Sequence, residues 1–223
     1  MLNSSKGNMY PWVTDTWNPI KGVCSHGCSY CFMRKWGHLK PIRLENSEFK
    51  TDLGKGNFIF VGSSTDDWAA AIPDDWILKT LDYCDTFENQ YLFQSKNPSR
   101  ILEFSDHPVF RRSVVCTTIE SNRFYPDVMN NSPKIEERVK AMAEIATKGI
   151  PVYVTCEPLM QFDLSDLVGM LKECKPKQVN IGRNSRRDVS IPEPTADEVM
   201  ALKAEIELFT KVEVKKNANI WMK

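Results

Sequence analysis

Three cysteines stand close together near the start of the chain, and their spacing suits metal chemistry. Cys24, Cys28 and Cys31 fall within eight residues in the pattern C-x3-C-x2-C. Thiolates are soft ligands that suit zinc or an iron–sulfur cluster, and three on one short loop can reach the same metal centre. Glycines in this loop, residues 22–32, give the backbone the freedom to wrap around such a group. The spacing therefore predicts a metal centre.

The number of ligands distinguishes the possible kinds of metal centre. A structural zinc site takes four ligands, so His26 or His38 would have to complete a Cys3His set. A [4Fe–4S] cluster has four irons, so three cysteines would leave one iron open to a small molecule. A chance grouping without a metal is the third interpretation. The four remaining cysteines show no second ligand spacing: Cys84, Cys116, Cys156 and Cys174. An odd total of seven favours a reducing compartment over a disulfide framework.

The sequence around these cysteines resembles the radical S-adenosylmethionine (radical SAM) superfamily. The aromatic Tyr30 precedes the last cysteine, as in that signature. The approach Thr16-Trp17-Asn18-Pro19 is similar to that of phage and bacterial three-Cys-motif proteins, which are radical-SAM-like and distantly related to spore photoproduct lyase. Further segments similar to that group follow in the expected order: residues 60–66, 93–98, 118–123 and 156–159.

The resemblance implies a cofactor pair, a [4Fe–4S] cluster and S-adenosylmethionine (SAM). The open iron would bind the amino and carboxylate groups of SAM. One electron from the reduced cluster would then cleave a carbon–sulfur bond, giving methionine and a 5′-deoxyadenosyl radical that removes hydrogen from a substrate. The distant lyase resemblance suggests a nucleic-acid or nucleotide substrate and a lyase or modification reaction. The implied electron donor is a flavodoxin or ferredoxin.

The elements that would position this site follow from the apolar patterning. Strands are expected at residues 12–17, 57–62, 90–94, 113–119, 150–156, 178–182 and 211–214. Helices are expected at residues 73–84, 98–104, 133–148 and 163–174, and behind a capping box at Thr195 and Glu198. This alternation predicts an α/β fold with a parallel sheet. Because a full eight-unit barrel usually needs about 250 residues, we expect a partial (β/α)6-type barrel of mostly parallel strands, or an open doubly wound sheet.

Ligands bind at the carboxyl ends of the strands in either architecture, so the residues found there are the candidates. Ser63, Ser64 and Asp66 follow the strand at 57–62, where the resemblance implies a site for the methionine ammonium of SAM. The alternative is an ordinary loop with a helix cap. Lys96 ends the next strand, and related lyases suggest that it meets the SAM carboxylate. A solvated lysine beside a turn is the other interpretation.

Later strand ends add polar groups. Thr118, Glu120 and Asn122 alternate along the strand at 113–119, so we expect them to share one side and to suit ribose hydroxyls. Glu157 precedes a proline and is expected at a strand end, where it binds SAM or substrate, or forms a structural ion pair. Arg183 opens a loop with three arginines in five residues, which suits phosphate or carboxylate, or is simply solvated.

Some aromatic and thiol side chains have two interpretations each. Cys156, near the end of its strand, is a candidate hydrogen donor to a product radical, whereas buried cysteines are usually inert. Trp12, Trp17 and Trp36 bracket the cysteine loop, where they pack around a cluster or stack on a substrate base.

Composition bounds the class of protein. The 223 residues are 42% hydrophobic and 26% charged, which is typical of one globular domain spanning residues 1–223. Equal numbers of basic and acidic residues, 29 of each, argue against a generally basic nucleic-acid coat. With no signal-peptide pattern and no apolar run near the roughly 18 residues that span a bilayer, we expect a cytoplasmic protein without membrane contact. The alternative to an enzyme is a metal-binding module, iron–sulfur or zinc, that senses redox state or binds a partner.

Overall fold

The computed structural model describes residues 1–222. Eight strands form one sheet in the order β1-β2-β5-β6-β7-β8-β9-β10. From β2 onward all neighbours are parallel, while β1 is antiparallel to β2. The strands are β1 (Asn3–Ser4), β2 (Asp15–Trp17), β5 (Phe58–Val61), β6 (Gln90–Gln94), β7 (Ser113–Thr118), β8 (Val152–Cys156), β9 (Gln178–Ile181) and β10 (Lys211–Val214). A separate pair, β3 (Ile20–Lys21) and β4 (Arg43–Leu44), flanks the cysteine loop.

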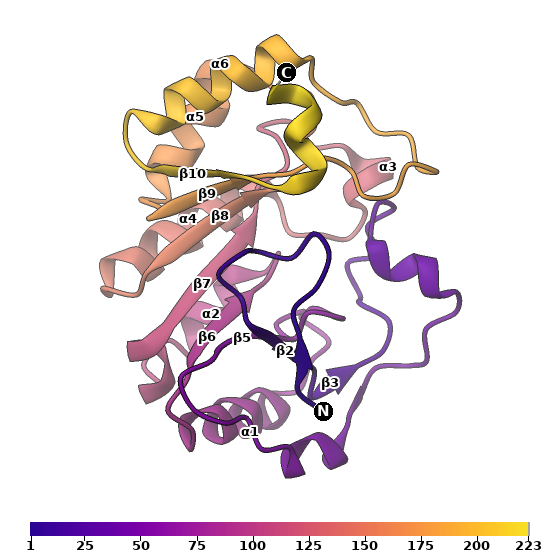
Figure 1. Cartoon of the computed structure of the whole chain (residues 1–223), viewed down its shortest axis with the longest axis vertical. Coiled ribbons are helices and arrows are strands. Elements are labelled where there is room, and N and C mark those ends of the chain that lie inside the picture. Colours follow the sequence, from indigo (N-terminus) through magenta and orange to yellow (C-terminus); the bar gives the residue numbers. More distant parts are fainter. Residues whose placement is uncertain (223) are drawn as a thin grey trace.

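From β5 onward, helices connect the successive parallel strands. They are α1 (Asp74–Asp85), α2 (Pro98–Glu103), α4 (Ile135–Thr147), α5 (Leu164–Glu173) and α6 (Ala196–Glu207). These five gather along one side of the sheet, and neighbouring helices pack on each other (Figure 1). Short elements complete the chain: α3 (Pro126–Met129) and the 3-10 helices η1 (Phe32–Trp36), η2 (Asn46–Lys50), η3 (Pro108–Arg112) and η4 (Lys216–Met222).

The strand order confirms the expected α/β class and decides between its two forms. In a doubly wound sheet the strand order reverses at a switch point, whereas here it follows the chain throughout. Within residues 1–222, β10 makes no ladder with β1 or β2, so the barrel is open rather than closed. All seven expected strands are present. Strand β2 begins three residues and β8 two residues inside the expected range, and the other strands differ by at most one residue at either end.

Alternating side chains give the sheet two different faces. On the helix side, residues such as Ile59, Phe93 and Val115 belong to the main core. On the opposite face a smaller cluster forms around Tyr10, Val13, Leu92, Val114 and Cys116. The N-terminal segment crosses this face, as the indigo loop in Figure 1 shows. It fills the inside of the open barrel.

Local signals account for the helices. Thr195 caps α6 and exchanges hydrogen bonds with Glu198, which confirms the capping box. The expected apolar stripe of α4 is buried against the sheet and the neighbouring helices, with Ile135, Met142 and Ile145 nearly inaccessible. None of the helices in residues 1–222 has the length and apolar character needed to cross a membrane.

Candidate functional site

The cysteine loop lies at the carboxyl end of the sheet, against the segment that joins α3 to α4 (Figure 1). The Ser29 amide donates to the Val128 carbonyl at 3.0 Å, and the Asn131 amide donates to the His26 carbonyl at 3.0 Å. Backbone N–H and C=O groups are strong hydrogen-bonding groups, so these bonds tie the loop to residues 128–132. Residues 128–132 therefore form a platform for the loop. No sequence pattern indicated this platform.

The three cysteines differ in their surroundings. Cys28 is buried, and its Sγ lies 3.2 Å from the Ser132 hydroxyl and 3.3 Å from Lys96 Nζ. Cys24 and Cys31 are partly exposed. Burial, together with the negative charge of Asp66, raises the pKa of Cys24 to about 12. Without a metal this thiol is therefore protonated at neutral pH.

The three thiols of the loop are the donors that an iron–sulfur cluster takes, although in this structure their sulfur atoms are not gathered around one point. Among residues 1–222, no three His, Cys, Asp or Glu side chains come together closely enough to hold a metal ion. His26 Nε2 bonds to Asp66 at 2.9 Å, and the His38 side chain is exposed. Three thiols on one docked loop remain a set that suits a cluster with one open iron.

Asp66 joins the ends of two strands, β5 and β6, to the cysteine loop. Its carboxylate accepts from His26 of the loop, from the Ser95 hydroxyl at 2.8 Å and from the Lys96 amide at 2.9 Å. It also accepts from the Trp68 amide at 3.0 Å. Burial alone would raise the pKa of Asp66, but these hydrogen bonds and the neighbouring histidine hold it below its usual value. With its lone pairs occupied, Asp66 positions the loop.

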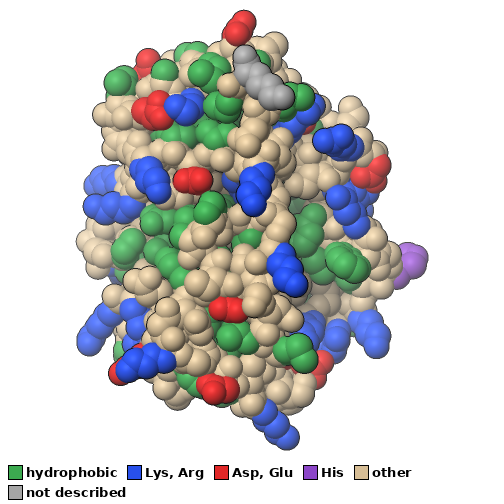
Figure 2. All heavy atoms as spheres, viewed as in Figure 1, with side chains coloured by type: hydrophobic (Ala, Val, Ile, Leu, Met, Phe, Trp, Pro, Cys, Tyr) green, Lys and Arg blue, Asp and Glu red, His purple; other side chains and the backbone are tan. Residues whose placement is uncertain are grey.

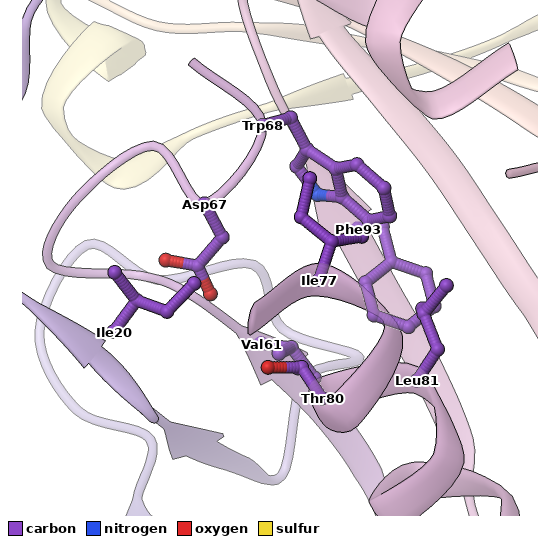
Figure 3. A pocket seen from close by; sticks show the side chains of 8 residues that line it. All are labelled: Ile20, Val61, Asp67, Trp68, Ile77, Thr80, Leu81 and Phe93. Atoms are coloured by element: carbon purple, nitrogen blue, oxygen red, sulfur yellow. The ribbon is translucent and has the colours of Figure 1, made fainter. Parts of the chain in front are cut away.

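Asp67 points the other way, into a small cavity beneath β5. Figure 3 shows its carboxyl group beside Ile20, Val61 and Thr80, among apolar side chains from β5, β6 and α1. In the described part of the chain, neither carboxyl oxygen has a hydrogen-bond partner. Burial and the charge of Asp66 raise the pKa of Asp67 well above its usual value. Gly62, at φ 76°, permits this packing, because a Cβ there would lie 2.5 Å from the Asp67 carboxyl carbon.

Ser63 and Ser64 follow β5, and both form hydrogen bonds with Asn18, which lies just before the cysteine loop. The Ser63 hydroxyl donates to Asn18 Oδ1 at 3.1 Å, and the Ser64 amide donates to the same oxygen at 2.9 Å. No hydrogen bond of the Ser64 hydroxyl is found within residues 1–222. Both serines are partly exposed, so Ser64 presents a free hydroxyl at this end of the sheet.

A buried charged network lies directly behind Cys28. Glu120 accepts hydrogen bonds from Tyr30 and from Arg138 Nη1, the latter at 2.8 Å, and Lys96 Nζ lies 3.0 Å from Glu120 Oε1. Glu120 and Arg138 are fully buried. Burial would raise the pKa of Glu120, but the charges of Arg138 and Lys96 lower it to about 2. The carboxylate is therefore ionised, and the network brings Lys96 and Glu120 together as two of the expected site residues.

Asn122 and Thr118 do not share a side with Glu120 in the way the alternation predicted. Strand β7 ends at Thr118, so the period of two stops there. Thr118 is buried, and its carbonyl accepts from Arg138 Nη1 at 2.8 Å. Asn122 instead bonds to Asp163 at the start of α5, with distances of 3.0 and 2.8 Å. The expected polar row is wrong beyond Thr118.

Glu157 stands at the end of β8 and is already well partnered. Its carboxylate accepts from Lys215 Nζ at 2.5 Å, from Asn8 at 2.7 Å and from Asn217 at 2.9 Å. These partners come from the two ends of the chain. Gly182 lies alongside, since a Cβ there would be 2.6 Å from the Glu157 carboxyl carbon. The arrangement matches the structural ion pair, and a ligand role for Glu157 stays a prediction.

The arginine loop contacts the cysteine loop. Arg186 Nη1 donates to the Cys31 carbonyl at 3.3 Å, and Lys35 Nζ donates to the Ser185 carbonyl at 2.8 Å. Arg183 forms a two-point ion pair with Glu193, and Arg186 pairs with Asp188. Arg187 is exposed, and no ion pair of this residue occurs in the described part of the chain. It is therefore the arginine of this loop best placed to meet an external anion.

Cys156 and two of the tryptophans are packing residues. Cys156 is fully buried in the helix-side core, where burial raises the pKa of its thiol. This surrounding favours the inert interpretation, and the hydrogen-donor role stays a prediction. Trp17 is also fully buried, and Trp12 packs inside the barrel with its ring 4.8 Å from Phe58. Trp36 differs, because it is 76% exposed on η1.

The face shown in Figure 2 carries no single continuous basic patch. Lys and Arg side chains are spread across that face and alternate with Asp and Glu. This pattern agrees with the net charge of zero. On this face an anion would therefore meet local groups of charge rather than a continuous basic surface.

Solved structures superpose on the chain over most of its length. A mutant of spore photoproduct lyase gives a TM-score of 0.65 at 12% identity, covering 93% of this chain and 78% of the lyase chain. SuiB of Streptococcus suis bound to S-adenosylmethionine gives 0.55 at 9% identity, covering 89% of this chain and 46% of SuiB. The chain has the fold of these radical SAM enzymes. No family model and no curated protein sequence matches it.

A third structure carries ligands. A spore photoproduct lyase mutant with bound AdoMet and dinucleoside spore photoproduct gives a TM-score of 0.57 at 11% identity. It is covered over 63% of its length, and this chain over 90%. Identities this low establish the fold, and the function rests on the residues of this chain.

Proposed function

We propose that this protein is a radical SAM enzyme, one domain over residues 1–223, whose cysteine loop holds a [4Fe–4S] cluster through Cys24, Cys28 and Cys31. One observation carries the proposal: a C-x3-C-x2-C loop is docked at the carboxyl end of a sheet with this fold. When bound, the cluster would supply the single electron that splits a carbon–sulfur bond of SAM, giving methionine and a 5′-deoxyadenosyl radical that abstracts hydrogen from a substrate.

The chain's own residues would hold the loop and bind SAM. Asp66 fixes the loop through His26, and residues 128–132 support it from the other side. The free hydroxyl of Ser64, with Ser63 beside it, is proposed to accept from the SAM ammonium. Buried strand ends around Thr118 exclude water from the same region, which protects a reactive radical. Roles for Asn122, Glu157 and Arg183 in cofactor binding are weaker proposals, because their polar groups are already paired.

A nucleic-acid or nucleotide substrate is the proposed substrate class. Support comes from the lyase neighbour that holds a dinucleoside photoproduct, and from the unpaired Arg187 beside the cysteine loop. The exposed Trp36 ring on η1 offers a surface on which a base can stack. The proposed electron donor is a flavodoxin or ferredoxin, the reaction type is a lyase or modification reaction, and the proposed location is the cytoplasm.

Electron paramagnetic resonance tests the proposal directly. The protein is reconstituted without oxygen, reduced, and measured before and after SAM is added. We expect a [4Fe–4S]⁺ signal that changes with SAM, since an open iron would bind it. Alanine at Cys24, Cys28 or Cys31 should abolish the signal, whereas Cys84→Ala, which removes a core thiol, should keep it.

Two results would overturn the enzyme assignment. A protein loaded with zinc, or a cluster indifferent to SAM, would leave a metal-binding module that senses redox state or binds a partner. In that case His38→Ala separates the two kinds of site. Loss of metal in this variant would identify His38 as the fourth ligand of a zinc centre, whereas the enzyme proposal expects His38 to be dispensable.

A further inference from the structure

The ammonium group of Lys96 has no hydrogen left for an external partner. An ammonium carries three N–H donors. Here Nζ lies 3.0 Å from Glu120 Oε1, donates to the Tyr30 hydroxyl, and donates to Cys28 Sγ at 3.3 Å. Its three partners all belong to the protein. The arrangement therefore disagrees with the expectation that Lys96 meets the SAM carboxylate.

Within residues 1–222, Lys96 is the one charged donor to the Cys28 sulfur. Ser132 also lies close, at 3.2 Å, but its single hydroxyl hydrogen is directed to the Met129 carbonyl at 2.8 Å. The serine therefore acts as an acceptor toward the thiol. Lys96 is the one cation that touches a cysteine sulfur within residues 1–222. A charge-assisted bond of this kind is stronger than a neutral one.

The surroundings hold Lys96 in this place. Glu120 is fixed by Arg138, and both side chains are inaccessible to solvent. The Lys96 side chain itself is only 14% exposed, so water screens its charge little. Arg138 in turn is anchored to the carbonyls of Thr118 and Pro133 at 2.8 and 2.9 Å. The position of the ammonium is therefore set by the fold, and does not depend on a ligand.

We propose that Lys96 acts on the cluster rather than on SAM: its ammonium bonds to the Cys28 sulfur and raises the reduction potential of the cluster. The proposal rests on the proposed function, because it needs the cluster to be present. Reduction adds one negative charge, and a buried positive charge next to a ligand sulfur stabilises the reduced form. Hydrogen bonds to ligand sulfurs are among the groups that set such potentials. Arg138 and Glu120 are positioning residues for this contact.

The test measures two quantities on the reconstituted protein. The midpoint potential comes from a redox titration followed by electron paramagnetic resonance, and the Kd for SAM from calorimetry. Lys96→Met removes the charge and keeps the length of the side chain. We expect its cluster to be at least tenfold harder to reduce, which is about 59 mV lower for one electron. The Kd for SAM should stay within threefold of the wild type.

Two further variants show whether the effect depends on the charge at residue 96 and on the position of that charge. Lys96→Arg keeps the charge, so its potential should stay close to that of the wild type. Lys40→Met removes an exposed positive charge near the cysteine loop, and its potential should also change little because water screens that site. Should Lys96→Met fail to load a cluster, Lys96→Gln carries the same test with a polar side chain.

The outcomes separate this inference from the proposed function. A Lys96→Met protein with an unchanged potential and a tenfold weaker Kd for SAM would overturn the inference and make Lys96 a SAM ligand. Failure of both neutral variants to load a cluster would also overturn it, by giving Lys96 a role in assembly. Either result leaves the enzyme assignment standing, as long as the wild-type cluster responds to SAM.

Discussion

Arg138 Nη1 lies 2.8 Å from Glu120 Oε2, and both side chains are completely inaccessible to solvent. The pair joins α4 to the end of β7, directly behind the cysteine loop. Burying two charges costs a large desolvation energy, so an ion pair of this kind adds little net stability by itself. Removing one partner, however, leaves the other charge buried without compensation.

Single substitutions in this pair are therefore expected to be costly. Arg138→Met or Glu120→Gln should lower the free energy of unfolding by about 3 kcal/mol, measured by urea denaturation of the protein without a cluster. The double variant should lose clearly less than the sum of the two single losses, because no unpaired charge remains. Surface substitutions usually change the free energy of unfolding by no more than about 0.5 kcal/mol. Single variants within that range of the wild type would contradict a large cost of breaking the buried pair.

The same carboxylate predicts a dependence of stability on pH. Glu120 has a pKa of about 2 in the folded protein, against about 4.3 in an unfolded chain. The folded state thus binds fewer protons, and stability from this group is present above pH 4 and is lost as the pH falls toward 2. Wild-type stability should decline more steeply over that range than that of Glu120→Gln. Parallel curves for the two proteins would rule out Glu120 as the source.

Asp67 predicts the opposite dependence. Its pKa is raised in the folded state, so the folded protein holds a proton that the unfolded chain releases near pH 4. The stability that Asp67 contributes is therefore present below pH 4 and is lost as the pH rises toward its folded pKa. Asp67→Asn keeps the shape and removes the ionisation.

Unfolding of the two proteins between pH 4 and 8 tests this. Asp67→Asn should be the more stable at pH 8, by about 1.4 kcal/mol for each unit by which the folded pKa is raised within this range. The exposed Asp127→Asn serves as the matched control and should leave the slope with pH as it is in the wild type. A wild-type slope equal to that of Asp67→Asn would show that this carboxyl group titrates normally.

The sequence allowed the strands and most helices to be located because each has a strong local pattern. The run at 90–94 has the apolar centre Tyr91-Leu92-Phe93 between two glutamines, and it forms β6 with those bounds. Arg138 was missed, although it left a signal. It falls on the apolar stripe of α4 between Ile135 and Met142, where a charged residue needs a buried partner. Its partner, Glu120, is 18 residues away, and no local pattern links the two.

In the candidate site, too, the sequence pattern located single residues but not the partners that they contact. Lys96, Asp66 and Glu120 were correctly expected at strand ends, because that depends only on where the strands stop. Their partners depend on long-range packing, which spacing does not reveal. For Lys96 the partners include a cysteine 68 residues away, and a contact with the SAM carboxylate was a prediction that spacing alone could not test. Asn122 was placed wrongly because β7 ends four residues before it.

The arginine loop gives the last prediction, which depends on the proposed nucleic-acid substrate. Arg183 and Arg186 are neutralised by Glu193 and Asp188, so only Arg187 is expected to meet a phosphate. Arg187→Ala should weaken binding of a short single-stranded oligonucleotide to a similar degree for every sequence, and should reduce the slope of log K against log salt by about 1. Arg111→Ala removes an exposed arginine just before β7 begins, at the opposite end of the sheet, and should change neither quantity. Fluorescence anisotropy at several salt concentrations measures both. Equal effects of the two substitutions would mean that the binding is non-specific surface attraction, and would remove the arginine loop as a substrate contact.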